Sequence, residues 1–130
     1  MATRAITSPT LPVAGRPYSP AVQVDNYIYV SGQASVDASG EVVPDTFAGE
    51  MHRSMANLQR VLEVAGLNLS HVIQVRGYVS RQDDIPEYNQ LYREYFSEPF
   101  PARTTLIGCL GKMLKFEIDV VAHTTYKRVK

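Results

Sequence analysis

FAGEMHRSMANLQRVLEVAG, residues 47–66, carries the clearest helical pattern in the chain. Its apolar side chains recur at spacings of three and four, the period of a helix with one buried face: Phe47, Met51, Met55, Leu58, Leu62 and Ala65. Asp45 or Thr46 is available as the N-cap, and Gly66 is a typical C-terminal stop. Because only one side of this helix is polar, the sequence predicts that the other side packs against a sheet.

β-rich segments lie on both sides of this helix. Before it, residues 22–32 contain two short runs around an Asp-Asn dipeptide that suits a turn, so we expect a hairpin. After it, residues 71–80 (HVIQVRGYVS) are rich in β-branched side chains and predict a strand. The last segment, residues 114–125 (LKFEIDVVAHTT), alternates between apolar and other side chains, which places Glu117 and Asp119 together on one face of a strand.

A second helix and a further strand complete the pattern. Residues 84–96 open with Asp-Ile-Pro-Glu, which resembles a capping box with proline in the first turn. Pro99 and Pro101 prevent this helix from continuing and lead into ARTTLIGCL, residues 102–110, a strand. The five strands and two helices that these patterns locate follow the order β-β-α-β-α-β-β. We expect one α+β domain over residues 1–130, with a mixed six-stranded sheet and two helices on one face.

Composition narrows the classes of function. Thirteen Lys and Arg residues balance thirteen Asp and Glu residues, so no net charge draws the chain to nucleic acid. No apolar run approaches the roughly 18 residues of a membrane span. The single cysteine, Cys109, cannot pair within the chain, and the three histidines lack metal-ligand spacing. We expect a cytoplasmic protein with neither a membrane nor a nucleic acid as partner, and with no metal.

One face of the sheet needs a cover. Two helices on one side leave the opposite face of the sheet uncovered. If that face carries Tyr78, Ile107 and Val121, its apolar area is too large to remain exposed to solvent. The sequence therefore predicts a homo-oligomer whose subunits cover one another's sheets.

Arg103 stands at the start of an otherwise apolar strand. Strand parity groups it with Thr105, Ile107 and Cys109. A guanidinium is always charged and cannot be left unpaired in a covered strand. Either a protein carboxylate satisfies it for structural reasons, or it binds the carboxylate of a ligand with its two-pronged geometry. The spacing alone leaves both alternatives open.

Glu117, in the following strand, is the nearest candidate to act with Arg103. If the two strands pair antiparallel, Glu117 falls near the level of Arg103 and both line one pocket. In a partly dry pocket this carboxylate could act as a general base toward a water molecule. The alternative is that Glu117 is merely the ion-pair partner of Arg103.

Six stretches resemble the Rid family, also called the YjgF-type family, of reactive-intermediate enamine/imine deaminases. They span nearly the whole chain: PYSPAV (17–22), YVSGQ (29–33), ANLQRVLEVAGLNLSHVIQV (56–75), YNQLYREYF (88–96), PFPAR (99–103) and FEIDVVA (116–122). The resemblance implies a chorismate-mutase-like α+β subunit, a homotrimer, and active sites in the clefts between subunits. It also implies hydrolysis of 2-imino or enamine acids to 2-oxo acids and ammonia, with no metal or organic cofactor.

The resemblance assigns roles to individual residues. Arg103 matches the position that holds the substrate carboxylate, and Glu117 matches the one that positions the hydrolytic water. Tyr18, Ser31 and Asn89 match positions that line the same pocket. A non-catalytic, small-carboxylate-binding regulatory trimer is the alternative reading of the same residues.

This chain also departs from the family pattern. Thr105 stands where many members have cysteine, the loop before Glu117 is shortened, and Pro20 replaces a glutamine. Arg16 replaces a glycine next to the pocket. It could bind the far carboxylate of a dicarboxylic enamine such as an aminomuconate, or it could simply face solvent.

Overall fold

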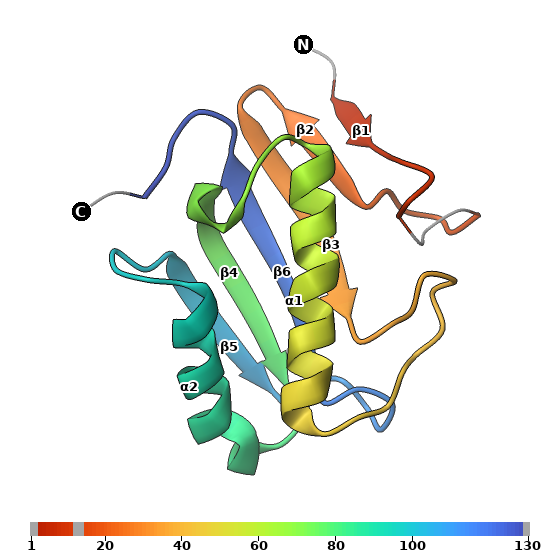
Figure 1. The fold of residues 1–130 in the computed structure, drawn as a ribbon, viewed down its shortest axis with the longest axis vertical. Helices are drawn as coiled ribbons and strands as arrows, with labels where there is room; N and C mark the ends of the chain where they lie inside the picture. Colours follow the sequence, from red (N-terminus) through yellow and green to blue (C-terminus); the bar gives the residue numbers. More distant parts are fainter. Residues whose placement is uncertain (1–2, 12–14, 129–130) are drawn as a thin grey trace.

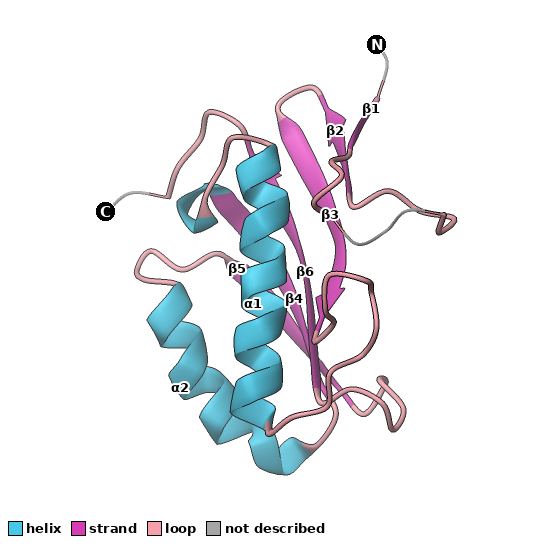
Figure 2. Cartoon of the chain, turned by 45° about the vertical axis from the view of Figure 1, so that its right-hand side comes forward, coloured by secondary structure: helices cyan, strands magenta, loops and turns pink. Residues whose placement is uncertain are grey.

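In the computed structural model, which describes residues 3–11 and 15–128, six strands form one mixed sheet with both helices on the same face (Figures 1 and 2). The sheet order is β1-β2-β3-β6-β4-β5. The strands are β1 (Arg4–Ile6), β2 (Ala21–Val24), β3 (Tyr27–Ala34), β4 (Val72–Val79), β5 (Ala102–Ile107) and β6 (Phe116–His123). The helices are α1 (Phe47–Val64) and α2 (Ile85–Tyr95), preceded by the 3-10 turn η2 (Gln82–Asp84), and a second such turn, η1 (Leu69–His71), precedes β4. The predicted α+β architecture is confirmed.

Helix α1 lies where its periodicity places it. Thr46 rather than Asp45 caps it, since the Thr46 side chain accepts the backbone N–H of Gly49 at 3.1 Å. At the other end the N–H of Leu67 donates to the carbonyl of Leu62 at 2.8 Å and closes the last turn. The predicted apolar face is the buried one, and Met51, Met55, Leu58 and Leu62 are completely covered.

Helix α2 begins differently from the expectation. Pro86 lies in its first turn as predicted, but the Asp84 side chain makes no capping hydrogen bond. The reason is that η2 precedes the helix, so the backbone of Asp84 is already helical (φ −86°, ψ −5°) instead of extended as a capping residue requires. The capping box at this position is therefore wrong.

The N-terminal half of the sheet holds one strand that the sequence did not locate. β2 and β3 form the expected hairpin, with Asp25 in a left-handed conformation (φ 52°) in its turn. β1 pairs antiparallel with the outer side of β2. With three residues, β1 is too short to show a period, which is why the pattern located five strands of the six.

The position of β5 is the main departure from the sequence prediction. β5 pairs in parallel with β4 at the edge of the sheet, whereas β6 lies between β3 and β4 and is antiparallel to both. The direct antiparallel pairing of β5 with β6 is therefore wrong. Burial explains the order, because every second side chain of β6 is buried, as a central strand requires, while most of β5 is exposed.

Within the described part of the chain, no element covers the face of the sheet opposite the helices (Figure 2). Tyr29 is 50% exposed on this face, beside Val121. Ile107, which was expected here, points to the helix side instead, because its parallel neighbour Val79 is part of the core. None of the described helices combines the length and the apolar character needed to cross a bilayer.

Candidate active site

Arg103 projects from β5 toward α2. Its Nη2 donates to the side-chain oxygen of Asn89 at 2.9 Å. Its guanidinium carbon lies 4.8 Å from the ring centre of Tyr88 and 4.7 Å from that of Tyr92, which is cation–π distance. An amide and two aromatic rings therefore orient the guanidinium without neutralising its charge.

A cavity of about 190 Å³ opens at this guanidinium. It is lined by Asn89, Tyr92, Arg93, Phe100, Pro101 and Arg103. Among the described residues, no carboxylate lies within ion-pair distance of Arg103. A fixed positive charge with free donors at the wall of a cavity is a site for an anion, and a carboxylate fits its planar geometry.

The hydroxyl groups around this cavity remain protonated at neutral pH. The hydroxyl oxygens of Thr105 and Tyr88 lie 3.1 Å apart. Burial raises the pKa of Tyr88, and burial together with the nearby Tyr88 raises the pKa of Tyr92 to about 12. These phenols therefore supply polarity beside Arg103 and no negative charge.

Glu117 lies on the opposite face of the sheet. It is half-buried and stands between the core residues Phe116 and Ile118 on β6, so it points away from the helices. Gly32 on β3 leaves room for it, since a Cβ there would overlap the Glu117 carboxylate. Ser31 precedes this glycine, and its hydroxyl donates to the Ser19 carbonyl at 2.6 Å.

The Ser31 contact ties the loop that carries Tyr18 to the middle of β3. Tyr18 itself is exposed, and the backbone N–H of Ser31 donates to the Pro20 carbonyl at 2.9 Å. Tyr18 therefore belongs with Ser31 and Glu117, and Asn89 and Thr105 belong with Arg103.

The carboxyl group of Glu117 is a stronger base than an ordinary glutamate. Burial raises its pKa, and the negative charge of Asp119 raises it further. Asp119 is held in place by Arg76 at 2.9 Å and by the Tyr78 hydroxyl at 2.5 Å. A raised pKa favours acceptance of a proton from water at a given pH.

The candidate residues thus form two groups on opposite faces of one sheet. In the sheet register Glu117 neighbours Tyr78, and Tyr78 neighbours Leu106, whereas Arg103 neighbours the core residue Val75. The expectation that Arg103 and Glu117 line one pocket of the same chain is wrong, and so is the alternative that they form an ion pair within one chain. One subunit alone cannot bring both to the same small ligand.

Arg16 lies outside the Arg103 cavity. It donates to the Gly40 carbonyl at 3.3 Å and lines a larger hollow of about 730 Å³ together with Arg81, Lys112 and Lys115. This hollow shares no lining residue with the cavity at Arg103.

The sequence pattern missed several residues of the Arg103 group. Tyr88 and Tyr92 lie on the buried side of α2, and their rings also contact the guanidinium. Arg93 and Phe100 line the cavity without any motif that marks them. The available signal was the pairing of an arginine at a strand start with tyrosines at helical spacing.

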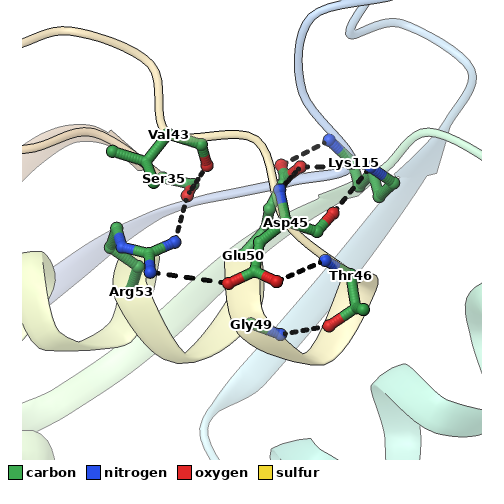
Figure 3. Close-up of polar contacts among 8 residues, drawn as sticks. All are labelled: Ser35, Val43, Asp45, Thr46, Gly49, Glu50, Arg53 and Lys115. Carbon is green, nitrogen blue, oxygen red and sulfur yellow. Dashed lines mark hydrogen bonds and ion pairs between the residues drawn. The ribbon is translucent and has the colours of Figure 1, made fainter.

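Glu50 supports the Glu117 group from the first turn of α1. Its carboxylate is buried (1% exposed) and accepts the backbone N–H of Lys115 at 2.9 Å, the Lys115 ammonium at 3.3 Å and the N–H of Asp45 at 3.2 Å (Figure 3). Lys115 lies two residues before Glu117. Glu50 therefore fixes the loop from which β6 begins.

The described residues bring no three His, Cys, Asp or Glu side chains together in an arrangement that would hold a metal ion.

Known proteins with similar sequences and similar folds identify the family to which this geometry belongs. Residues 9–124 match the family described as endoribonuclease L-PSP. The chain is 34% identical over 120 residues to a 2-iminobutanoate/2-iminopropanoate deaminase from Dermatophagoides farinae, with 91% of this chain and 94% of that protein covered. It is 35% identical over 119 residues to the protein of the same name from Bos taurus, with 90% and 87% covered. The crystal structure of YyfA from Yersinia pestis, a protein of unknown function in the conserved Rid family, matches with a TM-score of 0.86 at 27% identity, covering 94% of this chain and 99% of that one.

Proposed function

Because the chain belongs to the Rid family, we propose that it hydrolyses 2-imino or enamine acids to 2-oxo acids and ammonia, at sites shared between the identical subunits of a trimer. The observation that carries the proposal is the Arg103 guanidinium, which is oriented by neutral partners at the wall of a cavity and paired with no carboxylate of the described chain.

Arg103 would hold the substrate by its acid group. A two-pronged pair with the substrate carboxylate fixes the adjacent C=N carbon in one orientation. The positive charge also draws electron density away from that carbon, which favours attack by water. Asn89 keeps the guanidinium in place, since its side-chain oxygen accepts Nη2.

Glu117 of a neighbouring subunit would activate the water. Its carboxylate takes a proton from water as the water oxygen bonds to the imine carbon, and the electrons of the C=N bond move to nitrogen. That nitrogen takes the proton back from Glu117 to give an amino alcohol, and the proton of the new hydroxyl later passes to the nitrogen by the same route. When the C–N bond breaks, ammonia leaves and the remaining hydroxyl becomes the new carbonyl. The reaction needs neither metal nor organic cofactor, because imines already hydrolyse slowly in water.

The opposite orientation of Arg103 and Glu117 supports sites built between subunits. A face that bears Glu117 and Tyr29 is uncovered in one chain, and a second copy placed against it would supply Arg103 from outside. This arrangement would also bury the exposed side chain of Tyr29 and cover the uncovered face of the sheet.

A non-catalytic carboxylate-binding trimer is the second candidate. It is favoured by the placement of Arg103 and Glu117 on opposite faces of the sheet. An anion can bind in the Arg103 cavity without any general base. Turnover distinguishes the two functions.

The deciding experiment generates 2-iminobutanoate in situ with an amino acid oxidase and follows the formation of 2-oxobutanoate. We expect acceleration by the protein, and a loss of about 100-fold or more in kcat/KM for Arg103→Ala, since the charge that orients the reaction is gone. Glu117→Gln should lower kcat with little change in KM. The remote helix variant Arg60→Ala should behave as wild type. Binding of 2-oxobutanoate with no acceleration of imine hydrolysis would instead establish the binding protein.

A further inference from the structure

The Arg103 cavity contains a second guanidinium. We propose that Arg93 binds a second carboxylate there, so that this protein acts on 2-imino diacids in preference to monoacids. The catalytic part of this inference rests on the proposed function, and the binding part does not.

Asn89 brings the two arginines together. Its side-chain oxygen accepts Nη2 of Arg103 at 2.9 Å, and its backbone carbonyl accepts Nη1 of Arg93 at 3.3 Å. Asn89 and Arg93 lie one turn apart on α2, so they share a face of that helix. Both guanidinium groups therefore stand at one residue and line one cavity.

The charges in this cavity are unbalanced. The whole chain has a formal net charge of zero, but the lining residues include two arginines and no acid. Among the described residues, neither Arg93 nor Arg103 has a carboxylate within ion-pair distance. Two adjacent like charges repel each other, and a ligand with two anionic groups relieves both at once.

The rest of the lining suits the carbon chain of such a ligand. Tyr92, Phe100 and Pro101 form the apolar part of the wall. A short aliphatic segment fits against these surfaces while its two acid groups reach the two arginines. The volume of about 190 Å³ corresponds to a small metabolite and not to a polymer.

Arg93 takes the role that the sequence pattern gave to Arg16. Arg16 belongs to the separate hollow lined by Arg81, Lys112 and Lys115. Since that hollow shares no residue with the Arg103 cavity, Arg16 of the same chain does not stand beside the bound carboxylate.

Binding of stable 2-oxo acids tests the site without any turnover. Isothermal calorimetry compares 2-oxoglutarate, a diacid, with 2-oxobutanoate, a monoacid, on the intact protein. We expect wild type to bind the diacid more tightly. Arg93→Ala should weaken 2-oxoglutarate about tenfold and 2-oxobutanoate less than about twofold, because one charge-assisted contact is lost only from the diacid. Arg93→Lys should restore part of the difference, and Arg60→Ala should change neither affinity.

Kinetics separate this inference from the proposed hydrolysis. The same variants are assayed with 2-iminoglutarate and 2-iminobutanoate, each generated in situ. If Arg93→Ala selectively weakens binding of 2-oxoglutarate but wild type hydrolyses neither imine, the diacid site stands and the proposed hydrolysis is wrong. Equal effects of Arg93→Ala on both acids, or no effect on either, overturn the diacid site. So does a selective loss of the diacid in Arg16→Ala in place of Arg93→Ala.

Discussion

Arg103 shows how a charged side chain is kept ready for a ligand. Its partners within the chain are an amide oxygen and two aromatic rings. These contacts restrict the guanidinium without cancelling its charge, so little reorganisation is required when an anion arrives. A lysine could not replace it, because an ammonium lacks both the planar fork and the flat face that stacks on Tyr88 and Tyr92.

At the same scale, Asp119 adds to the effect of burial on the pKa of Glu117, and under the proposed function it would influence the pH dependence of activity. Burial and the charge of Asp119 both hold the pKa of Glu117 above its usual range, so the reactive carboxylate is lost as the pH falls through that raised value. In Asp119→Asn the negative charge is gone and Arg76 loses its partner, and both changes favour the ionised Glu117. We expect the acid limb of the kcat/KM profile to move to lower pH.

The comparison for this prediction is Glu63→Gln, which removes an exposed acid from the solvent side of α1 and should leave the limb in place. If the acid limb of the kcat/KM profile does not move in Asp119→Asn, or moves to higher pH, Asp119 does not lower the acidity of Glu117.

At the scale of elements, Glu50 connects the start of α1 to the start of β6. Its buried carboxylate accepts two backbone N–H groups as well as the Lys115 ammonium (Figure 3), and the Lys115 side chain is about half-exposed. Glu50→Ala leaves those backbone donors without a partner, so we expect a loss of about 2–3 kcal/mol in the free energy of unfolding. Lys115→Met removes the ammonium contacts to Glu50 and to the Asp45 carbonyl but leaves both backbone donors of Glu50 paired, so it should cost less, about 1–2 kcal/mol.

Urea unfolding of the two variants checks this difference. Because Lys115 lies so near to Glu117, Glu50→Ala should also lower kcat. Equal losses of stability in Glu50→Ala and Lys115→Met would mean that the ammonium contacts, and not the backbone contacts, hold the loop.

Arg128 performs a similar task for the loop that leads to Arg103. Its guanidinium donates to the carbonyls of Ser97 at 3.0 Å and Pro99 at 2.6 Å, and also to those of Leu69 and Val72. One side chain therefore links the segment after β6 to the segment before β5. Loops that enter and leave the site are thus held by single charged groups with several backbone partners.

At the scale of the whole molecule, the proposed site spans two subunits, because Arg103 and Glu117 lie on opposite faces of one sheet. If Arg103 of one subunit and Glu117 of another share a site, co-assembly of Arg103→Ala subunits with Glu117→Gln subunits rebuilds intact sites. Random assembly of equal amounts leaves about a quarter of the sites intact, so about a quarter of wild-type activity is expected above the residual activities of the two single variants. The measurement is the imine hydrolysis rate of the co-expressed proteins.

Co-expression of Arg103→Ala with the double variant Arg103→Ala/Glu117→Gln serves as the control, since neither chain supplies Arg103. Sedimentation of the same samples gives the size of the assembly, for which we expect three subunits. Assembled but inactive mixtures of the two single variants would mean that each site draws both residues from one chain.

The sequence by itself determined both helices, five of the six strands and the family. The 3.6-residue period of residues 47–66 placed α1, and the alternation of residues 114–125 placed Glu117 on the face opposite Phe116. Motifs such as PFPAR and FEIDVVA pointed to the family, and its fold is confirmed. Such patterns are local, so they are readable from neighbours along the chain.

Only the tertiary structure decided which residues meet. Strand alternation says which side chains share a face, but the insertion of β6 between β3 and β4 depends on which strand can bury a full apolar face. That nonlocal choice put Arg103 over the tyrosines of α2 and beside Arg93, and it put Glu117 on the other side of the sheet. Packing across the sheet, which no spacing along the chain encodes, thereby divided the candidate site into two halves.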